Sequence, residues 1–411
     1  MRILQTSQPA AIDRLVARDR SRDPRVEREA GRIVADVRRR GDDALRSWME
    51  RLDNVKPPFE ITPRELRAGW ARTPTSLRRA IQLAARHIER VARRQVPAPF
   101  TLDVRPGVRV AQRVEPLARV GCYVPGGRFP LPSTLLMTVV PARVAGVREI
   151  TVACPRPTPV VLAAALEAGA TRVLRIGGAQ AIAALAYGTA SIGRVDKIVG
   201  PGNAWVTAAK ARVSEDCAID FRAGPSEIVV YSDAGRPEWI AADLLAQAEH
   251  DPDARAILVT TCASLARDVA AAVRRRAPRP GNGRAATANI SAVVAANRME
   301  AIALIARLAP EHLVCDREID AQRCGPAGTV FVGEWSAQAA GDYGTGSNHV
   351  LPTGGAARWR GGLSAADFVR VFTVQRLTRR GLRGIGPSVA ALADAEGLSA
   401  HAASVRVRMA T

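Results

Sequence analysis

The sequence predicts an α/β protein built from two parallel-sheet units, with helical segments at both ends of the chain. From about residue 134 onward, short apolar runs alternate with helical stretches, and this alternation is typical of parallel sheets covered by helices. A Gly-Pro-Ser sequence near residue 224 interrupts the alternation, which favours two such units over one. The length of 411 residues also exceeds what one average core uses.

Residues 1–100 are expected to be mainly helical. Residues 26–52 have helical periodicity with a break at Gly41, and a second helix is predicted to begin just after Pro74 and to run to about Arg94. A proline pair at 97 and 99 then ends that helix. A hairpin is expected to follow, between residues 108–114 and 118–124.

The central part of the chain supplies the strands of both predicted sheets. Strands are expected at residues 150–154, 172–176, 197–199, 227–231, 256–260, 290–294, 312–315 and 329–332. Helices are expected between them at residues 159–168, 179–187, 239–249 and 299–308. From residue 364 the chain is predicted to be helical again and to end in an arm.

The composition excludes several classes of protein. No apolar run approaches the roughly 20 residues that span a bilayer, and the N-terminus lacks the apolar segment of a signal peptide, so a cytoplasmic location is expected. The six cysteines form no Cys-x-x-Cys pair. We interpret them as small buried residues and not as disulfide partners or zinc ligands.

The formal charge of +20 invites a nucleic-acid interpretation. The basic residues are almost all arginine and are spread along the chain, whereas aromatic residues make up only 4%. A face that binds single strands usually interleaves aromatic side chains for stacking. We therefore expect an arginine-rich, solvated surface, with neither nucleic acid nor membrane as a partner.

The histidines are the most informative polar residues. Four of the five lie from residue 250 onward, at His250, His312, His349 and His401, and each has Gln, Glu or Asp nearby. Histidine serves both as a metal ligand and as a base near neutral pH. This distribution predicts one assembled polar site.

Part of this set suits a metal ion. Gln247 and His250 are three apart near the end of a predicted helix, so both can project from one face. Asp342 lies in a glycine-rich loop that ends in His349, and such loops often carry functional side chains. Nitrogen and oxygen donors of this kind suit zinc or a similar divalent ion. The alternatives are an ordinary polar helix end, turn chemistry in the loop and an exposed helix residue at His401.

Glu311 and His312 are adjacent and follow Pro310. Neighbouring strand residues point to opposite faces, so a shared site requires a bend, which the proline allows. A carboxylate beside an imidazole offers two bases of different pKa for successive proton transfers. The alternative is a surface pair without a function.

Three glycine loops follow strand-like runs, at residues 124–127, 177–180 and 199–203. Open parallel sheets bind ligands at such positions. None of the loops matches Gly-x-Gly-x-x-Gly, and no Walker A motif is present. The loops can admit a phosphate or a ribose but do not specify a nucleotide.

Longer motifs make a resemblance specific. The chain contains Tyr123-Val-Pro-Gly-Gly, Gly177-Gly-Ala-Gln-Ala-Ile-Ala-Ala-Leu-Ala-Tyr-Gly-Thr, Asp196-Lys-Ile-Val-Gly-Pro-Gly-Asn, Ala223-Gly-Pro-Ser-Glu, Asp243-Leu-Leu-Ala-Gln-Ala-Glu-His, Pro310-Glu-His-Leu, Ala340-Gly-Asp-Tyr and Ser347-Asn-His-Val-Leu-Pro-Thr. In this order, from about residue 25 to 405, the sequence resembles the histidinol dehydrogenase family. The segment Pro278-Arg-Pro-Gly-Asn-Gly-Arg, the short N-terminus and the basic charge depart from the family pattern.

The resemblance implies oxidation of L-histidinol to L-histidine through the aldehyde with two NAD+, in a zinc-dependent homodimer with shared active sites. It implies His312 and Glu311 as the two bases. It also implies zinc ligands at Gln247, His250, Asp342 and His401, with His401 from the partner subunit. These four residues and the two bases would also contact the substrate, together with Ser226, His349 and Glu396. The expected NAD contacts are Tyr123, Gln180 and Asn203.

The family's sheets are Rossmann-like without the usual glycine fingerprint, and its C-terminal arm crosses to the other protomer. We divide the chain accordingly into a helical arm (1–24), a discontinuous first domain (25–120 and 227–363), a second domain (121–226) and a C-terminal helical arm (364–411). Three alternatives remain: a paralogue that oxidises another polar alcohol, a zinc hydrolase that uses Glu311 and water, and a nucleic-acid-binding protein.

Overall fold

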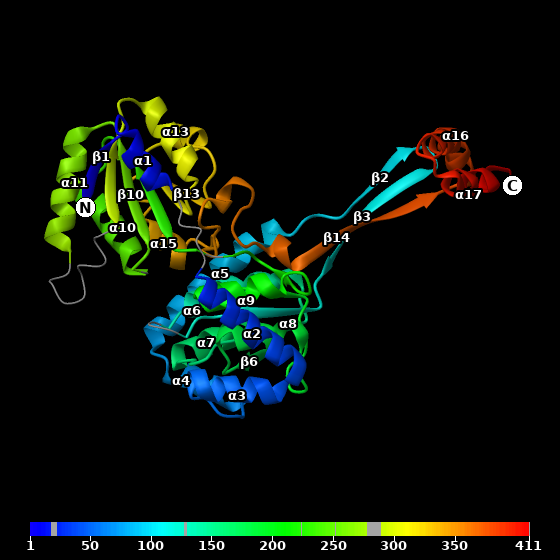
Figure 1. Cartoon of the computed structure of the whole chain (residues 1–411), viewed down its shortest axis with the longest axis horizontal. Helices are drawn as coiled ribbons and strands as arrows, with labels where there is room; N and C mark the ends of the chain where they lie inside the picture. The colour runs from blue at the N-terminus through cyan, green and yellow to red at the C-terminus, as the bar shows by residue number, and fades with distance from the viewer. Residues whose placement is uncertain (18–22, 127–129, 223, 251, 278–288, 411) are drawn as a thin grey trace.

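The computed structural model describes residues 1–17, 23–126, 130–222, 224–250, 252–277 and 289–410. The described residues form two units, each built on a parallel sheet, and an elongated arm that carries the C-terminus away from both (Figure 1). The expected α/β class with two parallel sheets is confirmed. The divergent segment 278–284 lies outside the described residues.

The larger sheet has the strand order β1-β11-β10-β9-β12-β13, with all neighbours parallel. Its strands are β1 (Arg2–Gln5), β9 (Glu227–Tyr231), β10 (Arg255–Thr260), β11 (Ile290–Val294), β12 (His312–Cys315) and β13 (Thr329–Val332). Helices α10 (Pro237–His250) and α11 (Ala263–Arg276) cover one face, whereas α1 (Pro9–Val16) and α13 (Arg298–Leu308) cover the other. Because both faces are covered, the central strands are continuous apolar runs.

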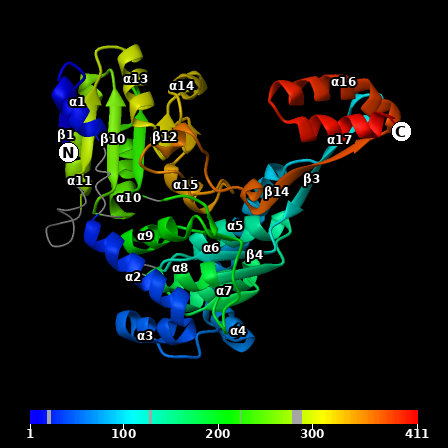
Figure 2. The same ribbon diagram turned by 45° about the vertical axis from the view of Figure 1, so that its right-hand side comes forward.

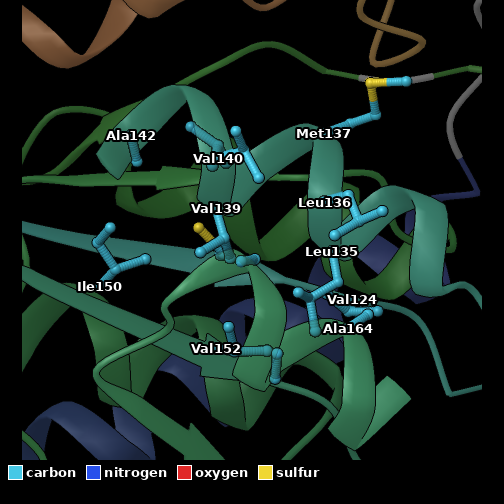
Figure 3. Packing of buried hydrophobic residues seen from close by; sticks show 14 of the residues in the cluster. Val124, Leu135, Leu136, Met137, Val139, Val140, Ala142, Ile150, Val152 and Ala164 are labelled. Carbon is cyan, nitrogen blue, oxygen red and sulfur yellow. The ribbon is translucent and has the colours of Figure 1, made fainter. Parts of the chain in front are cut away.

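The smaller sheet has the order β6-β5-β4-β7-β8 and is also parallel. It consists of β4 (Arg119–Tyr123), β5 (Glu149–Ala153), β6 (Arg172–Leu174), β7 (Lys197–Val199) and β8 (Ala218–Ile219). Helices α6 (Pro132–Ala145) and α7 (Pro159–Ala168) pack on one face, and α8 (Gly178–Tyr187) and α9 (Ala204–Val213) on the other. Figure 3 shows Leu135 and Val139 of α6 packed with Ile150 and Val152 of β5.

The N-terminal helices belong to the smaller-sheet unit. They are α2 (Pro24–Arg40), α3 (Asp42–Asp53), α4 (Pro63–Arg72) and α5 (Thr75–Gln95). Helix α2 packs on α8 and α9, α4 on α7, and α5 on α6, so their apolar stripes are buried there. The expected division differs from this packing, since it grouped residues 25–120 with 227–363. Residues 1–24 also differ from a purely helical arm, because β1 pairs with β11 at the edge of the larger sheet.

The arm is a three-stranded antiparallel sheet that ends in two helices (Figures 1 and 2). Its strands are β2 (Phe100–Arg105), β3 (Val108–Pro116) and β14 (Val369–Leu377), and its helices are α16 (Arg379–Ala395) and α17 (Ser399–Ala410). The predicted hairpin between 108–114 and 118–124 is wrong. Residues 119–123 form β4, which is buried in the centre of the smaller sheet and pairs with β5 and β7.

Short elements complete the structure: α14 (Glu318–Arg323), α15 (Gln338–Tyr343) and the 3-10 helices η1 (Ala356–Arg358) and η2 (Ala365–Phe368). All six cysteines are free, and five of them are buried, as the sequence predicted. Among the described residues, no helix combines the length and the apolar character that crossing a membrane requires.

Candidate active site

The two predicted bases lie at the amino end of β12 in the larger sheet, beside the amino end of the neighbouring strand β9. His312 is the first residue of β12 and is in register with Ile228 of β9, and Ser226 directly precedes β9. Because these parallel strands are adjacent, the residues that precede them come together at one edge of the sheet. Ala309, with a left-handed backbone (φ 40°), ends α13 and is followed by Pro310. Glu311 Oε2 and His312 Nδ1 are 3.7 Å apart.

Glu311 is buried and held by two hydrogen bonds. Its Oε2 atom accepts from Ser226 Oγ at 2.7 Å and from the Glu227 backbone N–H at 2.9 Å. Burial raises the pKa of Glu311 to about 7, although His312 and these hydrogen bonds lower it in part. The carboxyl group can therefore gain or lose a proton near neutral pH, as a general base requires.

The contacts of His312 define its tautomer. Its Nδ1 atom lies 3.3 Å from the Glu227 carbonyl oxygen, which can only accept, so Nδ1 carries the proton in the neutral ring. The buried Nε2 atom then holds the lone pair, and it has no hydrogen-bond partner among the described residues. Burial lowers the pKa of His312, but Asp342 and Glu311 raise it more, so that this pKa lies above its usual 6.5.

Asp342 and His349 are brought to the same place by α15 and the loop that follows it. Asp342 Oδ1 is 3.8 Å from His312 Nε2, and Asp342 Oδ2 accepts from Gln338 Nε2 at 2.7 Å. His349 Nδ1 donates to the Asp342 carbonyl oxygen at 2.9 Å, and its Nε2 lies 3.3 Å from Thr134 Oγ1 on α6. Burial raises the pKa of Asp342, but His312 and His349 lower it more, so the carboxylate stays ionised.

Gln247 has the clearest capacity to take a ligand. It lies on α10, its exposed fraction is 0%, and neither side-chain amide atom has a hydrogen-bond partner among the described residues. A buried amide left unpaired costs about 1–3 kcal/mol, so an unsatisfied Gln247 fits a site completed by a bound group. Helices α10 and α15 are in contact, which places Gln247 and Asp342 in one region.

Of the other two predicted zinc ligands, the structure describes the side chain of one, His401. His250 closes α10, and its side chain lies outside the described part of the structure. His401 is exposed on α17, and Glu396 is exposed at the end of α16, both on the arm away from α10 and α15 (Figures 1 and 2). Within the described residues, no three His, Cys, Asp or Glu side chains cluster as a metal site. Gln247 and Asp342 fit half of a divalent-ion site.

The three predicted NAD contacts lie at the carboxyl ends of strands in the smaller sheet. Tyr123 ends β4, Gln180 lies in the first turn of α8 after β6, and Asn203 caps α9 after β7. Strand order reverses at β4, between β5 and β7, and such a switch point is where open α/β sheets bind ligands.

Each of these side chains has a different environment. Tyr123 Oη accepts from the Gly178 N–H at 3.2 Å, and Asn203 Oδ1 accepts from the Val206 N–H at 3.1 Å. Gln180 Nε2 donates to Asp53 Oδ2 at 3.1 Å, whereas the buried Gln180 Oε1 has no partner among the described residues. Sequence reasoning missed Asp53 and Thr134, because both come from helices with no ligand-binding motif.

A parallel-sheet fold with a switch point and a buried glutamate–histidine pair is compatible with an α/β dehydrogenase. The family model described as "Histidinol dehydrogenase" matches residues 16–409. The histidinol dehydrogenase of Methanothermobacter thermautotrophicus is 45% identical over 392 residues, which cover 92% of each chain. That of Caulobacter vibrioides is 46% identical over 389 residues, covering 92% of this chain and 91% of the relative.

A solved structure agrees with these relatives. The crystal structure of histidinol dehydrogenase from Elizabethkingia anophelis superposes with a TM-score of 0.95 at 33% sequence identity, covering 100% of this chain and 98% of that one. The chain therefore belongs to the histidinol dehydrogenase family and is an oxidoreductase.

Proposed function

We propose that this chain oxidises L-histidinol to L-histidine through L-histidinal with two NAD+, as the last steps of histidine biosynthesis. The relatives carry the name of this activity. The observation that carries the proposal is the buried pair Glu311 and His312, two bases of different character held 3.7 Å apart. Two successive oxidations of one carbon need such a pair, because each requires its own proton transfer. Bound NAD+ would accept a hydride in each oxidation.

His312 is assigned to the first oxidation. With Nδ1–H donated to the Glu227 carbonyl, the lone pair of Nε2 is available to take the proton of the alcohol. Asp342 Oδ1, 3.8 Å from that nitrogen, stabilises the imidazolium that forms. Burial keeps water away from the transfer.

Glu311 is assigned to the second oxidation. As a carboxylate it removes a proton from the water that adds to the aldehyde. Ser226 and the Glu227 N–H hold one of its oxygens in place, so the other can face the water. A pKa near 7 leaves a large fraction of Glu311 ionised at neutral pH.

The substrate contacts follow from the same geometry. We assign Ser226 and His349 to L-histidinol because both adjoin the bases, His349 through Asp342. Glu396 is assigned to L-histidinol as well, since a carboxylate in a closed site requires a polar partner. Tyr123, Gln180 and Asn203 are assigned to NAD+, and the unpartnered Oε1 atom of Gln180 supports this.

One zinc ion per subunit is proposed, held by Gln247, His250, Asp342 and His401. The ion would orient the substrate through its amine and imidazole. The unsatisfied amide of Gln247 and the ionised Asp342 support this choice of donors.

The arm supports a homodimer with exchanged C-terminal arms. Apolar side chains stand exposed on β2, with exposed fractions of 51% for Phe100, 54% for Leu102 and 60% for Val104. Exposed apolar surface of this kind marks contact with another chain. His401 and Glu396 are distant from their proposed site in their own chain, so a second copy must supply them. We place the enzyme in the cytoplasm, with no nucleic-acid or membrane partner.

The proposal is tested with purified protein, L-histidinol and NAD+, by following NADH absorbance before and after removal of the metal by a chelator. We expect two NADH per histidinol, loss of activity with the chelator and its return on adding Zn2+. A zinc-loaded protein that forms no NADH contradicts the proposal. Activity only with another amino alcohol would favour a paralogue of the same fold.

A further inference from the structure

A buried ion pair between Lys210 and Asp220 lies beside the proposed NAD+ site. Lys210 is on α9, and Asp220 directly follows β8. Their side chains are 3% and 1% exposed, and the ammonium group donates to Asp220 Oδ1. None of the roles assigned so far involves either residue.

Both charged side chains form hydrogen bonds with the backbone of one residue, Gly200. Asp220 Oδ2 accepts from the Gly200 N–H at 2.7 Å, and Lys210 Nζ donates to the Gly200 carbonyl oxygen at 3.0 Å. Asp220 Oδ1 also accepts from the Phe221 N–H at 2.6 Å. The peptide groups on either side of Gly200 are therefore fixed in orientation.

Gly200 occupies the switch point of the smaller sheet. It follows β7 and begins the loop that leads to Asn203, and its φ of +110° is one that residues with a Cβ rarely adopt. A Cβ atom there would lie 2.1 Å from the Tyr123 carbonyl oxygen. The conformation of Gly200 thus determines how Asn203 and Tyr123 stand relative to each other.

We infer that Lys210 and Asp220 are positioning residues for NAD+, because they hold the 199–203 loop in its binding conformation. The inference rests on the proposed function. Stability alone does not account for the pair: taking two charges out of water is costly, and replacing a buried ion pair by uncharged residues is often neutral. Apolar residues cannot reproduce the two hydrogen bonds to Gly200. Lys210 donates to its carbonyl oxygen, and Asp220 accepts from its N–H.

The chain supplies a matched control at the other end of the same strand. Lys197 begins β7, and its Nζ atom donates to the Asp367 carbonyl oxygen at 2.8 Å and lies 3.3 Å from Asp367 Oδ1. This Lys–Asp pair is largely buried too, but it lies at the amino end of β7, away from the glycine loop.

The experiment compares K210M/D220N with K197M/D367N as full-length, zinc-loaded protein. Isothermal titration calorimetry gives the Kd for NAD+ and for L-histidinol separately, and thermal unfolding shows that each variant is folded. For K210M/D220N we expect the NAD+ Kd to rise by about tenfold or more, with the histidinol Kd unchanged. For K197M/D367N we expect both constants to stay at wild-type values.

A folded K210M/D220N protein with wild-type NAD+ affinity overturns the inference, as does an equal loss in both double variants. If K210M/D220N does not fold, D220N alone is measured, because asparagine keeps the shape of the side chain and one acceptor for the Gly200 N–H. We then expect a smaller rise in the Kd for NAD+, again with the Kd for histidinol unchanged. Wild-type protein that binds histidinol but no NAD+ contradicts the proposed function itself, which separates the two failures.

Discussion

The candidate site residues lie at opposite ends of the strands in the two parallel sheets. In the smaller sheet the candidate ligand contacts Tyr123 and Asn203 lie at the carboxyl ends of β4 and β7, on either side of the switch point. In the larger sheet Glu311, His312 and Ser226 lie at the amino ends of β12 and β9. The smaller sheet follows the general rule for open α/β folds, and the larger one does not.

The carboxyl edge of the larger sheet shows why a ligand has little to bind there. At its own switch point, between β9 and β12, Ser232 Oγ donates to Asp316 Oδ2 at 3.0 Å. Thr260 Oγ1 donates to Asp233 Oδ1 at 3.0 Å. These polar groups satisfy one another. Gln247 and His312, at the opposite edge, keep side-chain atoms that have no partner among the described residues.

The two units meet through the loop that follows α15 and carries the candidate substrate contact His349. His87 Nδ1 on α5 donates to the Gly344 carbonyl oxygen at 2.6 Å, and Asn348 Nδ2 donates to the Met137 carbonyl oxygen of α6 at 2.7 Å. His87 therefore anchors this loop to the smaller-sheet unit.

The largest expected effect is that of His312→Ala. Loss of the base at the amino edge of the larger sheet should lower kcat for histidinol oxidation by about 10²–10⁴. The Kd for NAD+ should not change, since the cofactor contacts lie on the other sheet. Stopped-flow measurement of NADH formation gives kcat, and calorimetry gives the Kd for NAD+. A loss of NAD+ affinity as large as the loss of kcat would contradict the assignment of substrate and cofactor to different sheets.

Glu311→Gln should affect mainly the second oxidation, by about 10² with L-histidinal as substrate. In the wild type, aldehyde oxidation should fall as the pH drops below 7, because burial raises the pKa of Glu311 to about 7 and only the carboxylate is a base. In the Glu311→Gln variant, the fall in the rate of aldehyde oxidation below pH 7 should be absent. Equal losses with histidinol and histidinal would argue against the division of roles.

Gln247→Ala should weaken zinc binding by about tenfold or more, without destabilising the metal-free protein, because an unpaired buried amide is removed. Glu249→Gln, an exposed change on the same helix, is the control. Metal competition titrations and thermal unfolding measure the two quantities. Wild-type zinc affinity in the alanine variant would remove Gln247 from the ligand set.

Mixing two inactive variants tests the exchanged arm. In a heterodimer of His312→Ala and His401→Ala, one of the two sites would contain both histidines. His312 would come from the His401→Ala subunit, and His401 from the arm of the His312→Ala subunit. Random reassociation should therefore restore roughly a quarter of wild-type activity. Two copies of the same variant provide the control, and no recovery after confirmed subunit exchange would show that each site is built within one chain.

The smallest effect concerns stability. The pKa of Glu311 is raised from 4.5 to about 7 in the fold, so its contribution to the free energy of unfolding is present below pH 4.5 and lost as the pH rises through 7. Glu311→Gln should therefore be more stable than the wild type at pH 8, on the order of 1 kcal/mol or more, but not at pH 4.5. Thermal unfolding of metal-free protein at both values gives the comparison, and a pH-independent difference would contradict it.

The sequence predicted the parallel strands because buried strands alternate with helices. It failed where pairing is non-local. Residues 108–114 and 118–124 look like a hairpin, yet β3 pairs with β14, more than 250 residues away. Lys210 and Asp220 gave no signal either, since their common target is a backbone group of Gly200. Figure 2 shows that α17, which carries His401, lies away from α10, which carries Gln247. The sequence alone does not indicate this separation.

A crystal structure with L-histidinol and NAD+ bound tests the central claim most directly. We predict density for histidinol beside His312, Ser226 and His349 at the amino edge of the larger sheet. Density for NAD+ is predicted against Tyr123, Gln180 and Asn203 at the carboxyl edge of the smaller sheet. Density for either molecule beside Ser232 and Asp316, at the carboxyl edge of the larger sheet, would contradict the assignment of opposite edges.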